Sequence, residues 1–453
     1  MKKLLLLLTA MLATSMGVLA QGNSWQTATL INSGATKTGT LDNTNTEDWY
    51  KITVTQEGTV QFIATPSGNL TISTNSNFNG LKNNSLYTRA WFAAQSSGST
   101  TFTCKVTDVG KGTYYVKIAR NNGSGTYTLK YTFTPCAQSN DPEPNDDYEH
   151  SSVLQSGTTV QGRMGYRTSD DITDIEDWYK IIVPEEGHVE FSVTPTESLT
   201  ISTNSNFNGL KNNSLYTRAW FAAQSSGSTT MICRATDVGK GTYYVRIYRN
   251  YGSGGYTLKY TFTPCALSND AEPNDDYEQA GWLKSGWTAQ GRLGYRTSDD
   301  ITDSYDWYRI KVTETGPVEI IVTPTESLTI STGSNINVIK NNGLSTVGWF
   351  YAQSSGSTTF TYQTNELAEG TYYVRIYRNN GSGGYRLTYN GPTMTGDVDG
   401  DNRVTISDVT DLIDHLLGAY DPSFAIGDAD VDGDGRITIS DVTELIDMLL
   451  TAE

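Results

Sequence analysis

The chain has 453 residues, and its 32 Lys and Arg against 49 Asp and Glu give a formal net charge of −17. This acidity argues against nucleic acid as a partner, because phosphate binding needs clustered cations. The three histidines leave little scope for histidine-based catalysis. With 43 Gly and 28 Tyr, the composition is typical of a turn-rich β protein rather than a helical enzyme.

Residues 1–20 have the pattern of a secretory signal peptide. Two lysines precede an apolar stretch, and Val18 and Ala20 place small residues at −3 and −1 of the expected cleavage site. An uncleaved anchor is the alternative, but the apolar stretch is short and interrupted by polar residues. No other segment reaches the roughly 18 apolar residues that a membrane span needs. We therefore expect a secreted chain with no membrane span after cleavage.

Three long repeats follow the signal peptide. The motif Asp-Trp-Tyr begins at Asp48, Asp177 and Asp306, in steps of 129 residues, and residues 70–101 and 199–230 are identical. A period this long exceeds that of a solenoid unit, so each copy should be a whole domain. We place the copies at 21–136, 137–265 and 266–392; the first has a truncated start.

Each copy has the pattern of antiparallel β structure. Residues 243–249 alternate with period two, a Gly-rich turn follows, and a second alternating run completes a hairpin. Amphipathic helical spacing appears only after residue 405. The sequence therefore predicts a mainly β chain: three tandem antiparallel, jelly-roll-like β-sandwiches and a small all-α module at the C-terminus.

The four cysteines recur with the repeat period. Cys104 and Cys233 are 129 residues apart, as are Cys136 and Cys265, and the third copy lacks both members. Joint loss is what an intradomain bridge predicts. We expect disulfides Cys104–Cys136 and Cys233–Cys265, each contributing about 3–4 kcal/mol in a chain-entropy model. Reactive thiols are the alternative, but no positively charged partner is apparent.

The second and third copies open with a shared motif. Residues 141–149 and 270–278 contain Glu-Pro-Asn-Asp-Asp-Tyr-Glu, and Asp-Trp-Tyr and Gly-Thr-Tyr-Tyr-Val follow in that order. This order resembles the bacterial pre-peptidase C-terminal domain, a β-sandwich appended to secreted proteases and similar in fold to clostridial collagen-binding domains. The resemblance covers about residues 139–390 and, more loosely, 23–134. Members are accessory to a catalytic domain, and none is visible in this sequence.

The first copy departs from that family in two ways. Its opening motif would fall inside the signal peptide, and its loop before Asp-Trp-Tyr is six residues shorter than in the other copies. In the second and third copies, oxygen-bearing side chains recur that would suit calcium, as in the related collagen-binding fold. They are Glu143, Asn145, Asp147, Asp174 and Asp177, and then Glu272, Asn274, Asp276, Asp303 and Asp306. The alternative is a Pro-Asn-Asp turn and an Asp that caps a strand.

The C-terminal module carries most of the negative charge. Residues 396–453 hold 13 Asp and 2 Glu against two Arg, a net charge of −13. Two 12-residue segments 33 positions apart, 397–408 and 430–441, place Asp at positions 1, 3, 5 and 12, a pattern that suits calcium. The predicted ligands are Asp397, Asp399, Asp401, Arg403, Thr405 and Asp408, and then Asp430, Asp432, Asp434, Arg436, Thr438 and Asp441. Both Arg would contribute main-chain carbonyls.

An amphipathic helix is predicted after each loop, and none before. Loop–helix repeated twice, with Asp at position 12, resembles the type I dockerin over about residues 395–453. A solvated acidic tail is the alternative, but such tails lack apolar stripes. The resemblance implies calcium as cofactor and a cohesin domain as partner. Positions 10 and 11, where the family often contacts its partner, are Ile406, Ser407, Ile439 and Ser440. Alternatively, the Ile residues belong to the core and the Ser residues cap the helices.

No catalytic motif is present. His150 and His188 do not recur between copies, and His415 stands alone in the acidic module. We predict no catalytic residues. The expected function is a secreted, non-catalytic modular protein whose dockerin recruits accessory domains to an extracellular or cell-surface assembly that degrades polysaccharide or protein. A hydrolase with its carboxylates in a sandwich, and an adhesin or spacer, are the alternatives.

Tryptophans raise the question of a ligand for the sandwiches. Trp49, Trp178 and Trp307 lie inside predicted strands and should belong to the core. Trp91, Trp220 and Trp349 recur with the repeat and either pack beneath loops or form exposed platforms. Exposed platforms would stack on sugar rings or on a peptide, so the possible ligands are polysaccharide and extracellular-matrix protein.

Overall fold

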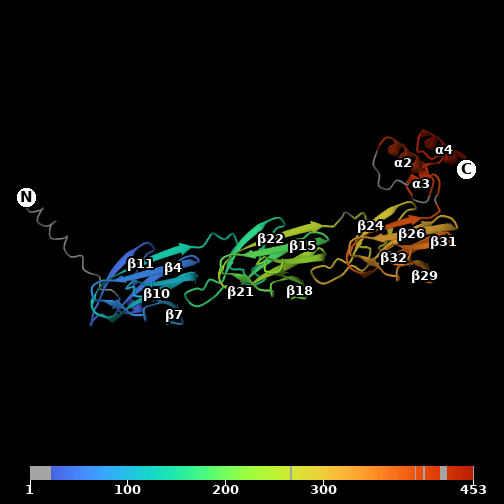
Figure 1. The fold of residues 1–453 in the computed structure, drawn as a ribbon. Helices are drawn as coiled ribbons and strands as arrows, with labels where there is room; N and C mark the ends of the chain where they lie inside the picture. The colour runs from blue at the N-terminus through green and yellow to red at the C-terminus, as the bar shows by residue number, and fades with distance from the viewer. Residues whose placement is uncertain (1–21, 266–267, 393, 401–402, 419–425, 452–453) are drawn as a thin grey trace, which may run out of the picture.

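The structure is a computed structural model that describes residues 22–265, 268–392, 394–400, 403–418 and 426–451. The predicted signal peptide lies outside these residues. Three β-sandwiches follow one another in a line, and a small helical unit lies beside the third, above it in this view (Figure 1). The predicted fold class is therefore confirmed. No helix in the described part of the chain is long and apolar enough to cross a membrane.

Each copy consists of a six-stranded and a five-stranded sheet with the same strand order in all three copies. A short 3₁₀ turn, η1 (Trp25–Thr27), precedes the first copy. The six-stranded sheet of that copy contains β1 (Thr29–Leu30), β3 (Glu47–Val54), β5 (Thr71–Ile72), β6 (Asn77–Lys82), β7 (Ser85–Trp91) and β10 (Gly112–Asn122). Its five-stranded sheet contains β2 (Thr36–Leu41), β4 (Gly58–Pro66), β8 (Ala93–Ala94), β9 (Phe102–Val109) and β11 (Gly125–Pro135).

The second and third copies repeat this plan. The six-stranded sheet of the second contains β12 (Ser152–Val153), β14 (Glu176–Val183), β16 (Thr200–Ile201), β17 (Asn206–Lys211), β18 (Ser214–Trp220) and β21 (Gly241–Tyr251). Its partner sheet contains β13 (Thr159–Met164), β15 (Gly187–Pro195), β19 (Ala222–Ala223), β20 (Met231–Val238) and β22 (Gly254–Pro264). In the third copy the six-stranded sheet contains β23 (Gly281–Trp282), β25 (Tyr305–Val312), β27 (Thr329–Ile330), β28 (Asn335–Lys340), β29 (Gly343–Trp349) and β32 (Gly370–Asn380). Its partner sheet contains β24 (Thr288–Leu293), β26 (Gly316–Pro324), β30 (Tyr351–Ala352), β31 (Phe360–Leu367) and β33 (Gly383–Asn390).

Alternating side chains explain why these segments form sandwich strands. In β4, Val60, Phe62 and Ala64 are fully buried while the residues between them are more exposed. Strand β10 buries its alternate residues on the same principle and pairs antiparallel with β3. Because the side-chain period of a strand is two, one face of each sheet is apolar and packs against the other sheet. Each copy has its own buried cluster, so each has an independent core.

The predicted disulfides are wrong: all four cysteines are free thiols in this structure. Cys104 lies in β9 opposite Phe62, buried in the core, whereas Cys136 follows β11 at the end of the sheet and donates to the Tyr166 hydroxyl at 2.9 Å. Strand β4 separates β9 from β11, so the two sulfurs of each copy cannot meet. Burial raises the pKa of the Cys104 thiol to about 12, which keeps it unreactive.

The helical unit contains α2 (Ile406–Leu416), α3 (Ile426–Ala429) and α4 (Ile439–Thr451). The predicted helices after both acidic loops are confirmed. Thr405 caps α2 through a capping box in which the Asp408 side chain reaches back to the Thr405 main chain. The expectation that no helix precedes either loop is wrong for the second, because the four residues of α3 lead directly into it. Among the described residues of this unit, six buried apolar side chains form a small core.

Candidate metal centres and docking surface

The first acidic loop brings three predicted ligands together. Carboxylate oxygens of Asp397, Asp399 and Asp408 lie within 4.8 Å of one another. Asp408 is fully buried, and its two oxygens accept the main-chain N–H groups of Asp399 at 3.0 Å and Thr405 at 2.7 Å. The residue at position 12 thus both closes the loop and completes the capping box of α2. Asp401, another predicted ligand, lies outside the described residues.

The second acidic loop repeats this geometry. Asp430, Asp432 and Asp441 place carboxylate oxygens within 4.8 Å of one another. Burial by itself would raise the pKa of Asp441, but the N–H donors of Thr438, Asp432 and Val431 hold that pKa below its usual range. Gly435 has a left-handed backbone with φ +85°, and its N–H donates to Asp430 at 2.9 Å, so the loop turns back onto its first carboxylate.

The remaining predicted ligands of the loops are not among the grouped carboxylates. Asp434 accepts the Arg436 main-chain N–H at 2.8 Å, which is a turn contact within the loop. The hydroxyls of Thr405 and Thr438 lie within 2.7 and 2.6 Å of Ser407 and Ser440. That Arg403 and Arg436 supply main-chain oxygens stays a prediction. The three grouped carboxylates in each loop suit a hard cation such as calcium, which takes six to eight oxygens.

The predicted partner-contact residues lie on the surface at the starts of α2 and α4. Ile406 is 72% exposed and Ile439 is 70% exposed, so neither belongs to the core. The helix-cap alternative for the serines is also unsupported at α2, where the cap is Thr405. Ser407 instead donates to Asp399 at 3.0 Å. The two Ile-Ser pairs therefore present nearly equivalent exposed patches at two related positions.

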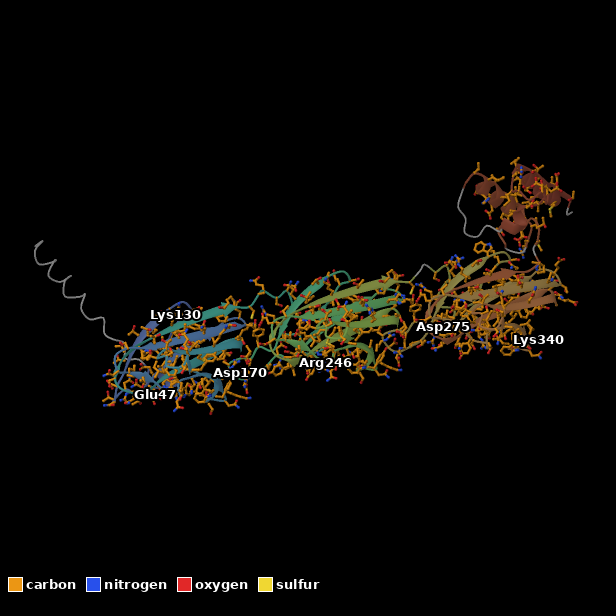
Figure 2. All side chains as sticks on the ribbon, in the orientation of Figure 1. Glu47, Lys130, Asp170, Arg246, Asp275 and Lys340 are labelled. Carbon is orange, nitrogen blue, oxygen red and sulfur yellow. The ribbon has the colours of Figure 1, made fainter. Side chains whose placement is uncertain are left out.

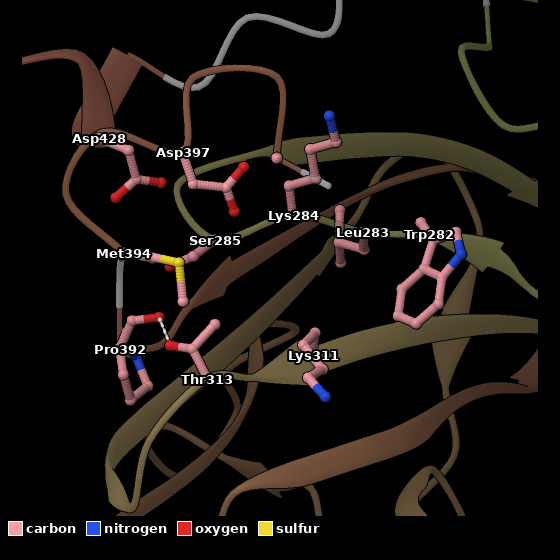
Figure 3. A pocket seen from close by; sticks show the side chains of 11 residues that line it. Trp282, Leu283, Lys284, Ser285, Lys311, Thr313, Pro392, Met394, Asp397 and Asp428 are labelled. Atoms are coloured by element: carbon pink, nitrogen blue, oxygen red, sulfur yellow. Dashed lines mark hydrogen bonds between the residues drawn. The ribbon is translucent and has the colours of Figure 1, made fainter. Parts of the chain in front are cut away.

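The helical unit contacts the third sandwich through its first acidic loop. Lys284 donates to the main-chain oxygen of Asp399, and its side-chain stem lies against Gly400. Figure 3 shows Lys284 with Leu283 and Trp282 on the sandwich side, and Asp397 and Asp428 on the other. Lys284 and Trp282 have no equivalents of their type in the other copies.

A buried carboxylate cluster lies in the second sandwich. Oxygens of Asp141, Glu143 and Asp177 lie within 4.8 Å of one another, and Asp177 is fully buried at the start of β14. Asp177 Oδ2 accepts the Tyr256 hydroxyl, whereas its Oδ1 has no hydrogen-bond partner among the described residues. A buried carboxylate oxygen without a donor is costly, so this cluster suits a bound cation.

Burial and the closeness of the acids to one another also raise the pKa values of the carboxyl groups in and beside the cluster. Burial, followed by the neighbouring Glu143, raises the pKa of Asp174 to about 8. Burial and then Asp141 raise the pKa of Glu143 to about 7, and the pKa of Asp177 is raised by burial and then by Asp174. Like charges in a buried site disfavour ionisation unless a cation compensates them. A cleft of about 290 Å³ between the first and second copies is lined by Glu143 and Asp174 and gives a route by which an ion can approach.

The third sandwich repeats the cluster in the same positions. Asp270, Glu272 and Asp306 group within 4.8 Å, and Asp306 Oδ1 has no hydrogen-bond partner in the described part of the chain. Burial, followed by Glu272, raises the pKa of Asp303 to about 8. Two copies thus carry the same uncompensated group of acids.

The first copy shows what replaces the cluster when the extra acids are absent. Asp48 corresponds to Asp177 and is also fully buried, but its Oδ1 accepts the side-chain amide of Asn45 at 3.0 Å. Asn45 occupies the position of Asp174. The same position is thus a neutral donor, Asn45, in the first copy and a carboxylate, Asp174, in the second. This difference indicates that the second copy needs a positive charge from another source.

Two predicted sandwich ligands lie away from the clusters. Asp147 is exposed and pairs with His150 at 2.8 Å, and Asp276 accepts the main-chain N–H of Glu278 at 3.0 Å. Asp141 and Asp270 take part instead, since each accepts a buried tyrosine hydroxyl at 2.8 Å. The sequence could have indicated Asp141 and Asp270, because each lies two residues before the Glu of the repeated Glu-Pro-Asn motif. Asn145 and Asn274 are buried, and their main-chain N–H groups donate to Glu143 and Glu272.

The tryptophans divide into two groups. Trp49, Trp178 and Trp307 are at most 9% exposed, which confirms their place in the core. Trp91, Trp220 and Trp349 are 55%, 56% and 44% exposed at the ends of the edge strands β7, β18 and β29, so packing beneath loops is excluded.

Known proteins resemble the chain in both kinds of domain. Residues 395–450 match the family model of the dockerin type I domain. Similar solved structures include the pre-peptidase C-terminal domain of collagenase from Bacillus anthracis, at 16% identity and a TM-score of 0.21, covering 27% of this chain and 100% of that chain. The CUB1-EGF-CUB2 domain of human MASP-1/3 matches at 10% identity and a TM-score of 0.16, covering 51% of this chain and 98% of that chain. TM-scores this low carry no functional argument. The chain therefore carries, over residues 395–450, a domain of the dockerin type I family.

Proposed function

We propose that this protein is a secreted, non-catalytic component that binds a cohesin domain through its dockerin and so attaches three sandwiches to an extracellular or cell-surface assembly. The observation that carries the proposal is the dockerin match at 395–450 together with the exposed Ile-Ser pairs at the starts of α2 and α4. An exposed isoleucine beside a serine combines apolar area with a hydrogen-bonding group, as protein interfaces require.

Calcium is the proposed cofactor of both kinds of site. In the dockerin, the grouped carboxylates of the two loops would hold the ions, and the small core makes folding depend on them. In the second and third sandwiches, a calcium ion would compensate buried acids such as Asp177 and Asp306, each of which has one oxygen without a donor among the described residues. Calcium supplies positive charge at both sites and no redox chemistry.

The sandwiches are proposed as binding modules for polysaccharide or matrix protein, serving an assembly that degrades such polymers. The repeated exposed Trp91, Trp220 and Trp349 support this, because an exposed aromatic face stacks on sugar rings or peptide side chains. The hydrolase alternative predicts polymer cleavage that is lost when Asp177 or Glu143 is changed. The spacer alternative predicts no retention on any polymer.

A pull-down with immobilised cohesin domains tests the docking proposal. The full chain should be retained with calcium and released by chelator. If the two patches are equivalent, alanine at Ile406 and Ser407 alone should leave binding largely intact, whereas changing all four patch residues should abolish it. Ile182→Ala, at a 62% exposed isoleucine of β14, is the matched control and should bind normally. Retention by the four-residue variant, or the absence of any cohesin that binds, would contradict the proposal.

A further inference from the structure

The first and second sandwiches contact each other through a loop that the first copy lacks. Residues 165–173, here called the donor loop, extend from the end of β13 onto the preceding copy. The main-chain N–H of Arg167 donates to Asp108 at 2.9 Å, Gly110 donates to Arg167 at 2.8 Å, and Leu81 donates to Ser169 at 2.7 Å. Figure 2 shows Asp170 of this loop where the first copy meets the second. The contact is therefore a short, specific main-chain pairing.

Side chains of the first copy complete the recognition. Arg89 is only 2% exposed, and it donates to the main-chain oxygens of Arg167 at 2.6 Å and Asp108 at 3.0 Å. Tyr87 donates its hydroxyl to Thr168 at 3.1 Å, and Lys82 pairs with Asp171 at 3.3 Å. A nearly buried guanidinium whose donors reach two main-chain oxygens fixes both position and orientation. We call Lys82, Tyr87, Arg89, Gly110 and Lys111 the acceptor face.

The close approach of the two copies leaves little room for a side chain at position 110. A Cβ at Gly110 would lie 3.0 Å from main-chain atoms of Arg167 and Thr168. The neighbouring Lys111 contributes its main-chain oxygen, which accepts from Ser169 at 3.3 Å. Its ammonium pairs with Glu57 at 3.8 Å, and Glu57 also pairs with Arg163 of the second copy at 3.0 Å.

The junction between the second and third copies reproduces these contacts. Arg218, 1% exposed, donates to Arg296 at 2.6 Å, and Tyr216 donates to Thr297 at 3.2 Å. Lys211 pairs with Asp300 at 3.2 Å. The donor loops 165–173 and 294–302 are identical in sequence. One recognition mode is therefore used twice.

The outer ends of the array lack one half of this pair each. In the third copy the positions of Tyr87, Arg89, Gly110 and Lys111 are Ser345, Val347, Ala368 and Glu369. Of the three acceptor cations only Lys340 remains, a methyl group occupies the close-approach site, and an acid replaces the second lysine. In the first copy, three residues, 42–44, stand where the donor loop has nine.

We propose that the acceptor face is a binding site for the donor loop of another sandwich of this type. We also propose that neither end of the three-sandwich array can bind a further sandwich. The first copy offers a face but no loop, and the third offers a loop but no functional face. Both complete acceptor faces are occupied by donor loops of the same chain. The array therefore does not bind a fourth sandwich, either in the same chain or from another molecule. The sequence differences between otherwise similar copies thus encode their order.

A gain-of-function experiment tests closure in the full chain. One variant replaces residues 42–44 with the sequence of 165–173, a second carries S345Y, V347R, A368G and E369K, and a third combines both changes. Sedimentation velocity should show monomers for the parent and for each single variant. The combined variant should form head-to-tail oligomers whose sedimentation coefficient rises with concentration. A combined variant that stays monomeric would overturn the claim that these residues suffice for recognition.

A loss-of-function experiment tests the face directly. The full chain carries Y87S, R89V and K111E, which give the first face the third copy's residues at three of the four positions that differ. Dyes at the exposed Ser97 and Ser226 report the distance between the first and second copies by single-molecule energy transfer. The distribution should broaden markedly. Lys105→Glu, which matches the charge change of K111E at an exposed β9 position, should leave it narrow. A distribution as narrow as that of the parent would overturn the proposal, and circular dichroism verifies that the variant is folded.

Discussion

The dockerin loops and the sandwich clusters both gather carboxylates, but they do so in opposite ways. In the second loop, Asp430, Asp432 and Asp441 come from 12 consecutive residues. In the second sandwich, Asp141 and Asp177 are 36 residues apart and meet because a loop and β14 converge. We therefore expect the loop to depend on a cation for its shape, whereas the sandwich has a core of its own.

The largest effect should be the loss of the dockerin fold on calcium removal. A unit of this length buries little apolar surface, with six buried apolar side chains in the core of its described residues, so we expect its folding to need the free energy of ligand binding. In the full chain, chelator should abolish hydrogen-exchange protection throughout α2 and α4 and leave β10 protected. Equal protection of α2 and α4 with and without chelator would contradict the dependence on calcium.

A smaller effect should follow from making the second copy resemble the first. Asp174→Asn places an amide where Asn45 donates to Asp48, so Asp177 Oδ1 should gain a donor. Without calcium, the second sandwich should become more stable by about 1–3 kcal/mol, since a buried acceptor is satisfied. Hydrogen exchange of β14 in chelator should slow by about tenfold or more, while β25 of the third copy serves as the internal reference.

Calcium should no longer stabilise the second sandwich of the Asp174→Asn variant. Asp147→Asn is the matched control, because Asp147 is exposed and pairs with His150. That change should leave both the stability in chelator and the response to calcium unaltered. A calcium response that Asp147→Asn removes and Asp174→Asn keeps would show that the ion lies elsewhere.

The converse change in the first copy should lower its stability, and calcium should not restore it. Asn45→Asp removes the amide donor of the buried Asp48 and puts a second, half-buried carboxylate beside it, which costs about 1–3 kcal/mol of stability. No residues equivalent to Asp141 and Glu143 are available among the described residues of the first copy to complete a site. Exchange from β3 should therefore accelerate equally with and without calcium. Restoration by calcium would mean that two acids suffice for the site.

The smallest expected effect concerns the backbone of the second loop. Gly435 has φ +85°, a conformation that costs other residues about 1 kcal/mol. Gly435→Ala should weaken calcium binding by this loop about fivefold to tenfold in calorimetry of the full chain, with no change at the sandwich sites. An unchanged isotherm would show that the loop tolerates the strain.

Local patterns in the sequence predicted the sandwiches, the two helices and the grouping of Asp397 with Asp408 within one loop. They failed for Cys104 and Cys136, because a shared repeat period does not report distance across a sheet. The sequence patterns also led us to predict Asp147 as a ligand instead of Asp141. Both acids lie near the same motif, and the pattern does not record that Asp147 faces solvent whereas Asp141 faces the cluster. The exposure of Ile406 was open in the sequence, and the tertiary structure places this residue on the surface at the start of α2.

The sequence by itself determined the properties that depend on neighbours along the chain: the period of 129 residues, the alternation of the strands and the spacing of the acidic loops. Only the tertiary structure decided which distant groups share a site. It placed Asp141 beside Asp177, separated the cysteines by strand β4, and set Arg89 against the loop that carries Arg167. The physical reason is that strand pairing and domain contact bring together residues far apart in the chain, and a one-dimensional pattern records neither.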